Sequence, residues 1–168
     1  LSLASLTFMF AMGLSVTAMI RIGNQKGLED YVTLRKVAIS IFLLTIIIEV
    51  VFALLFVLLH TSLPYIFVDI NDFKNLTENL EVISISANLL LVAAVFQISD
   101  GLQVVVLGAL RGLQDAKIPM YITFVAYWVI GFPISIYLAL ETELKAVGVW
   151  IGLLAGLTAA AIFLYIRF

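Results

Sequence analysis

Five long apolar stretches constrain this chain more than any other feature of its sequence. A helix that crosses a lipid bilayer needs about 20 consecutive, mostly apolar residues. The candidate stretches are residues 1–22, 37–59, 83–110, 118–140 and 146–166. Hydrophobic residues make up 64% of the chain and charged residues 12%, whereas a soluble domain averages about 45–50% and about 25%. We therefore expect an all-α fold, a polytopic membrane helix bundle with five transmembrane helices.

A soluble five-helix bundle is the alternative that the sequence has to exclude. The helices of such a bundle would carry a polar face that repeats every 3.6 residues. The run ISIFLLTIIIEVVFALLFVLL, residues 39–59, has no such face. The first stretch begins directly at Leu1 without a preceding charged segment, and we expect the chain to be an internal piece of a longer protein.

The basic residues between the stretches predict an orientation. If the five helices alternate in direction, one side receives Arg21, Lys26, Arg35, Lys36, Arg111, Lys117 and Arg167. The other side receives only Lys74 and Lys145. Loops rich in Lys and Arg favour the cytoplasmic side of a membrane. We therefore expect the C-terminal end to be cytoplasmic and the loop that contains Lys74 to lie outside.

A polar stripe interrupts the third stretch. Gln97, Asp100 and Gln103 follow each other at three-residue spacing and so share one helix face. A charge at the bilayer centre costs at least about 2.5–3.5 kcal/mol, and we expect the carboxylate to face a cavity, a cation, a proton or a partner helix. A buried salt bridge is the structural alternative, but no Lys or Arg lies in the core of any stretch. Asp100, with Gln97 beside it, is the main candidate cation-binding residue.

Glu49 is a second acid within an apolar stretch, the second one. By the same cost it is a candidate for cation binding. A lone acid in lipid can also stay protonated, because the charged form is costly there. Both interpretations of Glu49 remain open at this point.

Small residues predict where helices pack closely. Gly148, Gly152 and Gly156 recur every four residues in the fifth stretch, and small residues on one face let helix backbones approach each other in lipid. Packing within the chain is the simpler interpretation, and a dimer interface is the alternative. In the fourth stretch, Gly131 and Pro133 predict an interrupted or kinked helix, because proline lacks a backbone donor.

The sequence indicates no enzyme. It contains no cysteine and one histidine, His60, so Cys- and His-rich metal sites are excluded, and the only metal that we expect is a possible Na⁺ at Asp100. The segment RIGNQKG, residues 21–27, follows an apolar stretch, which is the wrong context for a nucleotide-binding loop. A net charge of −2 gives no basic surplus for nucleic acid. We therefore expect no catalytic residues and no cofactor.

Four local sequences in order resemble one family. They are RIGNQKG (21–27), SDGLQVVVLGALRGLQD (99–115), YWVIGFP (127–133) and GVWIGL (148–153). They resemble segments of multidrug and toxic compound extrusion (MATE) transporters, and of their NorM-type branch in particular. The resemblance covers essentially the whole chain and implies that residues 1–168 are a partial C-terminal lobe, helices eight to twelve of twelve.

The resemblance implies a secondary active antiporter of the bacterial cytoplasmic membrane with alternating access. Such a protein exports cationic or aromatic drugs in exchange for Na⁺ or H⁺, and it would work with the N-terminal lobe of the same chain and with membrane lipids. Asp100 falls at the position of the family's cation-binding aspartate. Phe8 falls at an aromatic position of the eighth helix, and Ala11 replaces a common proline. We expect Phe8, Gln103 and Tyr127 to line the substrate cavity.

Two other functions remain as alternatives. A lipid-linked saccharide flippase of the same superfamily would usually need cationic residues to meet pyrophosphate, and the stretch cores contain none. A non-transporting membrane scaffold or an enzyme subunit would have no need for Asp100. A neutral substitution of that residue distinguishes a scaffold from a transporter.

Overall fold

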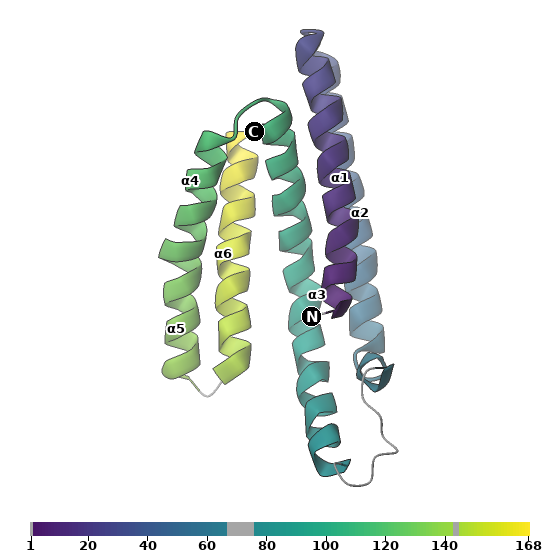
Figure 1. Ribbon diagram of the computed structural model, residues 1–168, viewed down its shortest axis with the longest axis vertical. Coiled ribbons are helices and arrows are strands. Elements are labelled where there is room, and N and C mark those ends of the chain that lie inside the picture. Colours follow the sequence, from purple (N-terminus) through teal and green to yellow (C-terminus); the bar gives the residue numbers. More distant parts are fainter. Residues whose placement is uncertain (1, 67–75, 143–144) are drawn as a thin grey trace.

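The computed structural model describes residues 2–66, 76–142 and 145–168, which form a bundle of long helices (Figure 1). Four long helices are α1 (Ser2–Gly27), α2 (Tyr31–Leu59), α3 (Leu76–Gly112) and α6 (Lys145–Arg167). Between α3 and α6 in the sequence, three shorter helices follow each other end to end and form one further rod-like helix, called the fourth rod here. That rod consists of α4 (Lys117–Val125), the π-helix η2 (Ala126–Gly131) and α5 (Phe132–Leu140). A short 3₁₀-helix, η1 (Leu63–Ile66), follows α2.

The five expected spanning helices are confirmed. Five helices of the described chain are long and apolar enough to cross a membrane: Ala4–Gly27, Tyr31–Leu59, Val82–Gly112, Lys117–Leu140 and Val147–Arg167. Spanning helices that follow each other in the chain run antiparallel, so α1, α3 and α6 point the same way. The described residues contain no strand. The loop that contains Lys74 lies outside the described residues, so the prediction for that loop stays a prediction.

The connection between the first two helices is much shorter than the gap between the predicted stretches 1–22 and 37–59. α1 continues to Gly27 and α2 begins at Tyr31, because polar residues can extend a helix beyond the apolar part of a span. Glu29 has a left-handed φ of 58°, and the Asp30 N–H donates to the Gln25 carbonyl at 3.1 Å, which is a Schellman ending. Asp30 then caps α2 by accepting from the Thr33 N–H at 3.0 Å. This hydrogen bonding lowers the pKa of Asp30.

The turn between α3 and α4 repeats this geometry. Gln114 has a φ of 60°, and the Asp115 N–H donates to the Leu110 carbonyl at 3.0 Å. Both turns and the C-terminus lie at the same end of the bundle (Figure 1). Side chains join them there: Lys26 Nζ donates to the Leu113 carbonyl at 2.6 Å, and Arg167 Nε pairs with Asp115 Oδ2 at 3.0 Å.

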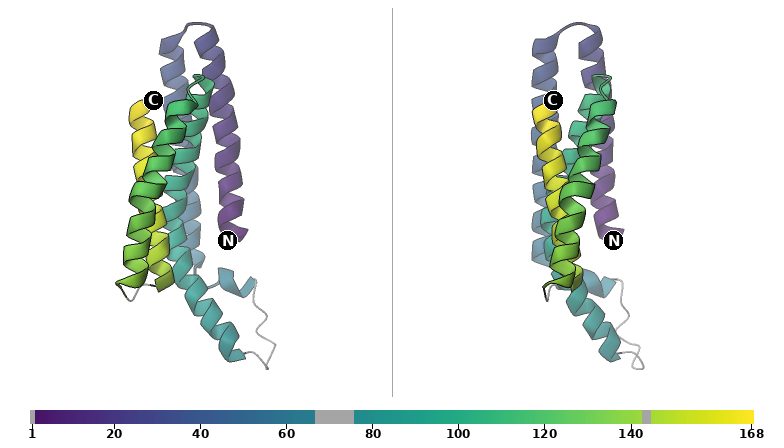
Figure 2. Two further views of the ribbon diagram at one scale, coloured as in Figure 1. Left: turned by 60° about the vertical axis from the view of Figure 1, so that its left-hand side comes forward. Right: turned by 90° about the vertical axis from the view of Figure 1, so that its left-hand side faces the viewer.

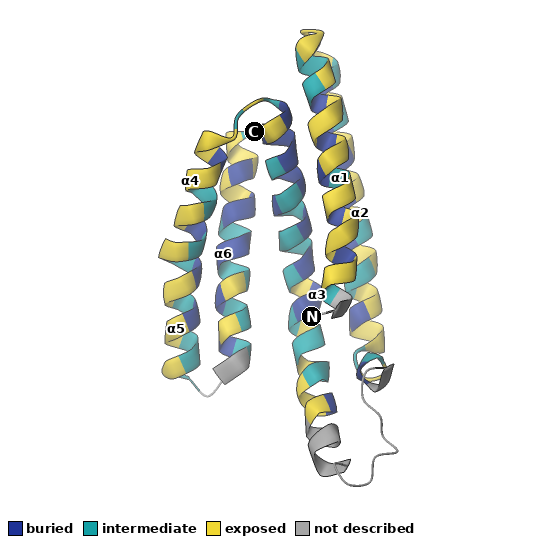
Figure 3. Ribbon diagram, in the orientation of Figure 1, coloured by how far each residue is buried: buried dark blue, intermediate teal, exposed yellow. Residues whose placement is uncertain are grey.

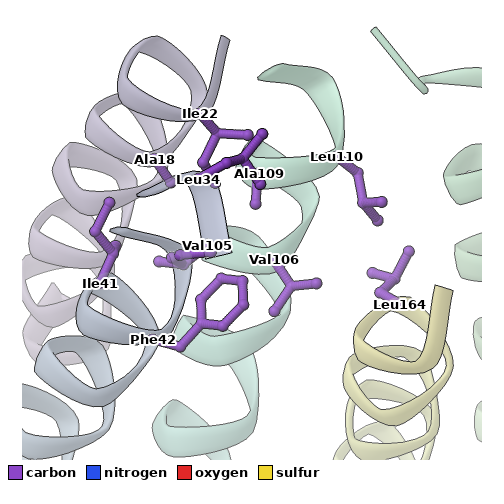
Figure 4. Close-up of a cluster of buried hydrophobic side chains, with 11 residues drawn as sticks. Ala18, Ile22, Leu34, Ile41, Phe42, Val105, Val106, Ala109, Leu110 and Leu164 are labelled. Carbon is purple, nitrogen blue, oxygen red and sulfur yellow. The ribbon is translucent and has the colours of Figure 1, made fainter. Parts of the chain in front are cut away.

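α3 is the central helix of the bundle. It contacts α1 and α2 on one side and α6 on the other, while α4, η2 and α5 pack against α6. The turned views show the first turns of α3 leaning away from the other helices (Figure 2). A core cluster joins α1, α2, α3 and α6 (Figure 4). Its members are Ala18, Ile22, Leu34, Ala38, Ile41, Phe42, Val105, Val106, Ala109, Leu110 and Leu164.

The outer faces of α1, α2, α4 and α5 are largely exposed and apolar (Figure 3). In each spanning helix, only 17% to 39% of its apolar 18-residue segment is buried. Large apolar side chains such as Leu58, at 74% exposure, and Leu140, at 77%, face outward. Lipid is the solvent that suits such a surface, which is consistent with an integral membrane protein.

Candidate functional site

The polar stripe of α3 faces the interior of the bundle. Gln97 and Gln103 are each only 5% exposed, and Asp100 between them is partly buried. The spacing of three residues produces this shared face. α3 packs against neighbours on both sides, and its polar side chains reach them rather than the lipid.

Glu49 of α2 meets this stripe. Its side chain is 1% exposed, and its backbone carbonyl accepts a hydrogen bond of 3.2 Å from Gln97 Nε2. The Glu49 carboxyl group is also close enough to Asp100 to interact with it electrostatically. The fold therefore brings together the two acids that the sequence placed in separate apolar stretches.

Gly101 is the residue that makes this contact possible, and sequence reasoning did not identify it. A Cβ atom at position 101 would lie 2.6 Å from Glu49 Oε1 and 2.8 Å from Glu49 Cδ. Real Cβ atoms do not approach other atoms so closely, so the Glu49 carboxyl group occupies the space that a larger residue would fill. The signal in the sequence was the Asp100-Gly101 pair itself, since a glycine inside a helix usually has a packing reason.

Tyr127 approaches the stripe from the fourth rod. Its hydroxyl donates to Gln103 Oε1 at 2.6 Å. The hydroxyl is also close enough to the Asp100 carboxyl group for the two to interact electrostatically. A neighbouring hydrogen bond of 3.0 Å joins the hydroxyls of Ser99 and Thr158. α3 is thus linked by polar contacts to α2, to η2 and to α6.

The π-helix η2 sets the position of Tyr127. The sequence predicted an interruption at Gly131 and Pro133, and the structure places a π-helical turn at residues 126–131 instead of a break. The Phe132 N–H donates to the Tyr127 carbonyl, which is the i→i+5 pattern of a π-helix. Proline follows at the start of α5, directly after this π-helical turn. Such turns are frequent at functional sites.

An apolar groove of about 440 Å³ begins beside Tyr127. It runs between η2, α5 and α6. Its lining includes Tyr127, Trp128, Phe132, Ser135, Val149 and Leu153. Tyr127 therefore has a polar cluster on one side and an apolar groove on the other. Phe8 lies on α1 with 37% exposure, and the interactions among the described residues do not join it to this cluster.

The glycines of α6 pack against the fourth rod. A Cβ at Gly148 would lie 2.7 Å from the Leu138 carbonyl oxygen, and a Cβ at Gly156 would lie 3.0 Å from the Gly131 Cα. A Cβ at Gly152 would collide with Ser135. The fourth rod therefore covers this glycine face of α6. A similar approach of α1 and α3 at Gly108 accompanies the hydrogen bond of 2.8 Å from Ser15 Oγ to the Val104 carbonyl.

The cluster contains carboxyl, amide and phenol groups and no basic group. Within the described residues, neither Asp100 nor Glu49 takes part in an ion pair, and the pair between Arg167 and Asp115 lies at the end of the bundle. The same residues hold no group of three or more His, Cys, Asp or Glu side chains that could bind a metal ion. This chemistry suits a small cation with oxygen ligands or a proton rather than an anion.

Comparison with known proteins connects this geometry to a family. The model of the MatE family matches residues 1–137. The chain belongs to the MatE family. It is 38% identical over 168 residues to the probable multidrug resistance protein NorM of Rhodopseudomonas palustris, and 36% identical to those of Xylella fastidiosa and Agrobacterium fabrum.

All three alignments cover 100% of this chain but only 34%, 34% and 35% of those relatives. The chain thus spans about a third of the length of these MatE relatives. The family resemblance that the four local sequences indicated is confirmed. The relatives' names describe multidrug resistance proteins and no enzyme.

Proposed function

We propose that residues 1–168 form part of the C-terminal lobe of a secondary active multidrug antiporter. In this proposal the protein exports cationic or aromatic drugs from bacteria in exchange for Na⁺ or H⁺, by alternating access between two lobes. It lies in the cytoplasmic membrane with its C-terminal end in the cytoplasm. The relatives' names support the drug substrate, and the site described above supports the cation.

One observation carries the proposal: the partly buried Asp100 has no basic partner within the described residues. A membrane protein that only needs stability gains nothing from an unpaired acid in its interior, because that acid costs free energy during insertion. A bound cation or a proton provides the missing compensation. Drug export then follows if cation and drug alternately occupy one cavity next to Gln103 and Tyr127.

The two alternative functions fit the site less well. A flippase of pyrophosphate-linked saccharides needs positive charge in its cavity, and the described cluster contains acids and neutral groups. A scaffold or enzyme subunit needs no acid at position 100. The antiporter is therefore the function that the residues support best.

Substitution of Asp100 tests this proposal. In the full-length transporter, Asp100→Asn should abolish ion-dependent drug efflux, because asparagine is nearly isosteric but neither charged nor titratable. The melting temperature in detergent should not fall, since a neutral amide is easier to hold in the membrane. The measurement is ethidium efflux from a pump-deficient host at equal expression, with the exposed Glu141→Gln as the control for loss of one acid.

Each outcome has a distinct meaning. A stable and inactive Asp100→Asn variant supports the antiporter. A destabilised variant would instead indicate a structural salt bridge with a partner outside the described residues, because removing one member leaves the other charge unpaired. Wild-type efflux by this variant would remove Asp100 from the mechanism and contradict the proposal.

A further inference from the structure

Two basic side chains near the start of α2 have no ion-pair partner within the described chain. Arg35 and Lys36 are exposed, and neither side chain forms an ion pair or a hydrogen bond with another described residue. Asp30 is close enough to Lys36 to interact with it electrostatically, but its carboxylate caps α2 by accepting from the Thr33 N–H. The two positive charges are therefore available to a partner outside the described chain.

An exposed apolar stripe runs along α2 from these two charges. Its residues follow Lys36 at intervals of three or four positions and so share one helix face with it. The stripe consists of Ile39, Leu43, Ile47, Val50, Leu54 and Leu58, whose exposed fractions lie between 38% and 74%. No other described element covers these side chains, so the stripe is a surface for lipid hydrocarbon.

The length of the stripe fixes the depth of the two charges. From Lys36 to Leu58 the helix rises about 33 Å, at about 1.5 Å per residue, and the hydrocarbon core of a bilayer is about 30 Å thick. With the stripe in the hydrocarbon, Arg35 and Lys36 lie at the depth of the lipid phosphates. Tyr31, which is 65% exposed, lies one turn before Arg35 on the same face, at the level where interfacial aromatic residues are enriched.

We propose that Arg35 and Lys36 bind the phosphate of an anionic phospholipid whose acyl chains lie along the apolar stripe of α2. This inference goes beyond the proposed transport function and does not depend on it. The guanidinium group of Arg35 can donate two parallel hydrogen bonds to phosphate oxygens, and the Lys36 ammonium adds a point charge. A zwitterionic headgroup would bring its own positive group against these side chains. A free phosphate ion would make no use of the stripe.

Fluorescence quenching by brominated lipids tests this inference. In the full-length transporter without other cysteines, Leu43→Cys carries a fluorescent label on the stripe, about two turns from Lys36. The protein is placed in vesicles that contain brominated phosphatidylglycerol or brominated phosphatidylcholine, and quenching reports which lipid lies against the label. The anionic lipid should be preferred about fivefold or more, the contribution of one basic residue near an anionic lipid surface.

Substitutions and a second label position locate the preference. The double variant Arg35→Gln/Lys36→Gln should lose it, and its melting temperature should equal that of the wild type because both side chains are exposed. Lys117→Gln is the matched control: it removes an exposed basic residue at the same end of the bundle and should leave the preference unchanged. A label at Leu58→Cys, at the opposite end of the stripe, should show no change in the double variant.

Four results would overturn the inference. Equal quenching by the two lipids at position 43 would show that α2 does not select a headgroup. A label that neither lipid quenches would show that another part of the transporter covers this face. An equal loss of preference in Lys117→Gln would indicate a general positive potential rather than a site on α2. A preference that disappears when inorganic phosphate replaces chloride at equal ionic strength would identify a site for free phosphate.

Discussion

At the residue scale, the arrangement of the site depends on a missing side chain. Gly101 lets the carboxyl group of Glu49 rest against the backbone of α3 beside Asp100. A glycine within a helix is unfavourable by roughly 0.5–1 kcal/mol relative to alanine. Its presence here is explained by the space that Glu49 needs rather than by the helix.

Substitution of Gly101 by alanine should therefore destabilise the protein, by about 1–3 kcal/mol, because the added methyl group overpacks the contact. The double variant Glu49→Ala/Gly101→Ala should recover much of this loss, since it removes the group that the methyl collides with. Thermal unfolding in detergent measures both effects. Gly13→Ala is the matched control: nothing lies within 4 Å of a Cβ at Gly13, so that variant should be neutral or slightly more stable. Additive effects of the two substitutions would contradict the contact.

At the element scale, α6 and the fourth rod approach each other through glycine. Gly148, Gly152 and Gly156 lie against Leu138, Ser135 and Gly131 in turn. Such close backbone contact stabilises helix pairs in lipid, where no hydrophobic effect drives helices together. The hydrogen bond of 3.2 Å from Ser135 Oγ to the Val149 carbonyl fixes the register of the pair.

Gly152→Leu should accordingly lower the melting temperature more than Leu153→Ala does. The leucine side chain would have to displace the Ser135 backbone, whereas Leu153 is 40% exposed and its truncation leaves the helix contact intact. Detergent melting curves of the two variants compare a packed position with its neighbour on the same helix. Equal melting temperatures would show that this face contributes no packing energy.

The elements were predictable from the sequence to a different degree than their contacts. A spanning helix needs only a long enough run of apolar residues, so all five spans could be predicted from the linear sequence. The contact between Glu49 and Gly101 joins residues of two helices, and no local pattern encodes which faces meet. The combination of Gly131 and Pro133 predicted a disturbed helix, but a kink, a break and a π-helical turn all satisfy that pattern. η2 also packs against α6, and the local sequence does not specify that contact.

At the scale of the whole molecule, the two similar turns and the C-terminus gather at one end. Lys26 reaches the turn after α3, and Arg167 reaches Asp115 in the same turn. Lys26 and Arg167, two of the basic residues that we predict to be cytoplasmic, therefore lie at one end of the bundle. That this end faces the cytoplasm stays a prediction from the distribution of basic residues.

Cysteine labelling of intact cells tests that orientation. Cysteines introduced at the exposed positions Glu29 and Lys117 should react only after the cytoplasmic side is opened, and a cysteine at Thr61 or Lys74 should react from outside. The chain contains no native cysteine, so a signal from this part of the protein reports the introduced residue. Labelling of position 74 from the cytoplasm alone would reverse the topology.

The placement of Glu49 also bears on how the protein is made. α2 precedes α3 in the chain, so we expect Glu49 to enter the membrane before α3 packs against it. Insertion scales assign about −0.3 to −0.6 kcal/mol to each Leu or Ile and about +2.5 to +3.5 kcal/mol to an acid such as Asp. The apolar 18-residue segment of α2 has a mean hydropathy of 3.1, the highest among the five spans of the described chain, against 2.0 for that of α3. Outward-facing residues of α2 such as Ile47 and Leu54, which are 60% and 56% exposed, contribute little to the folded core. We expect that they and the other apolar residues of α2 together offset the insertion cost of Glu49.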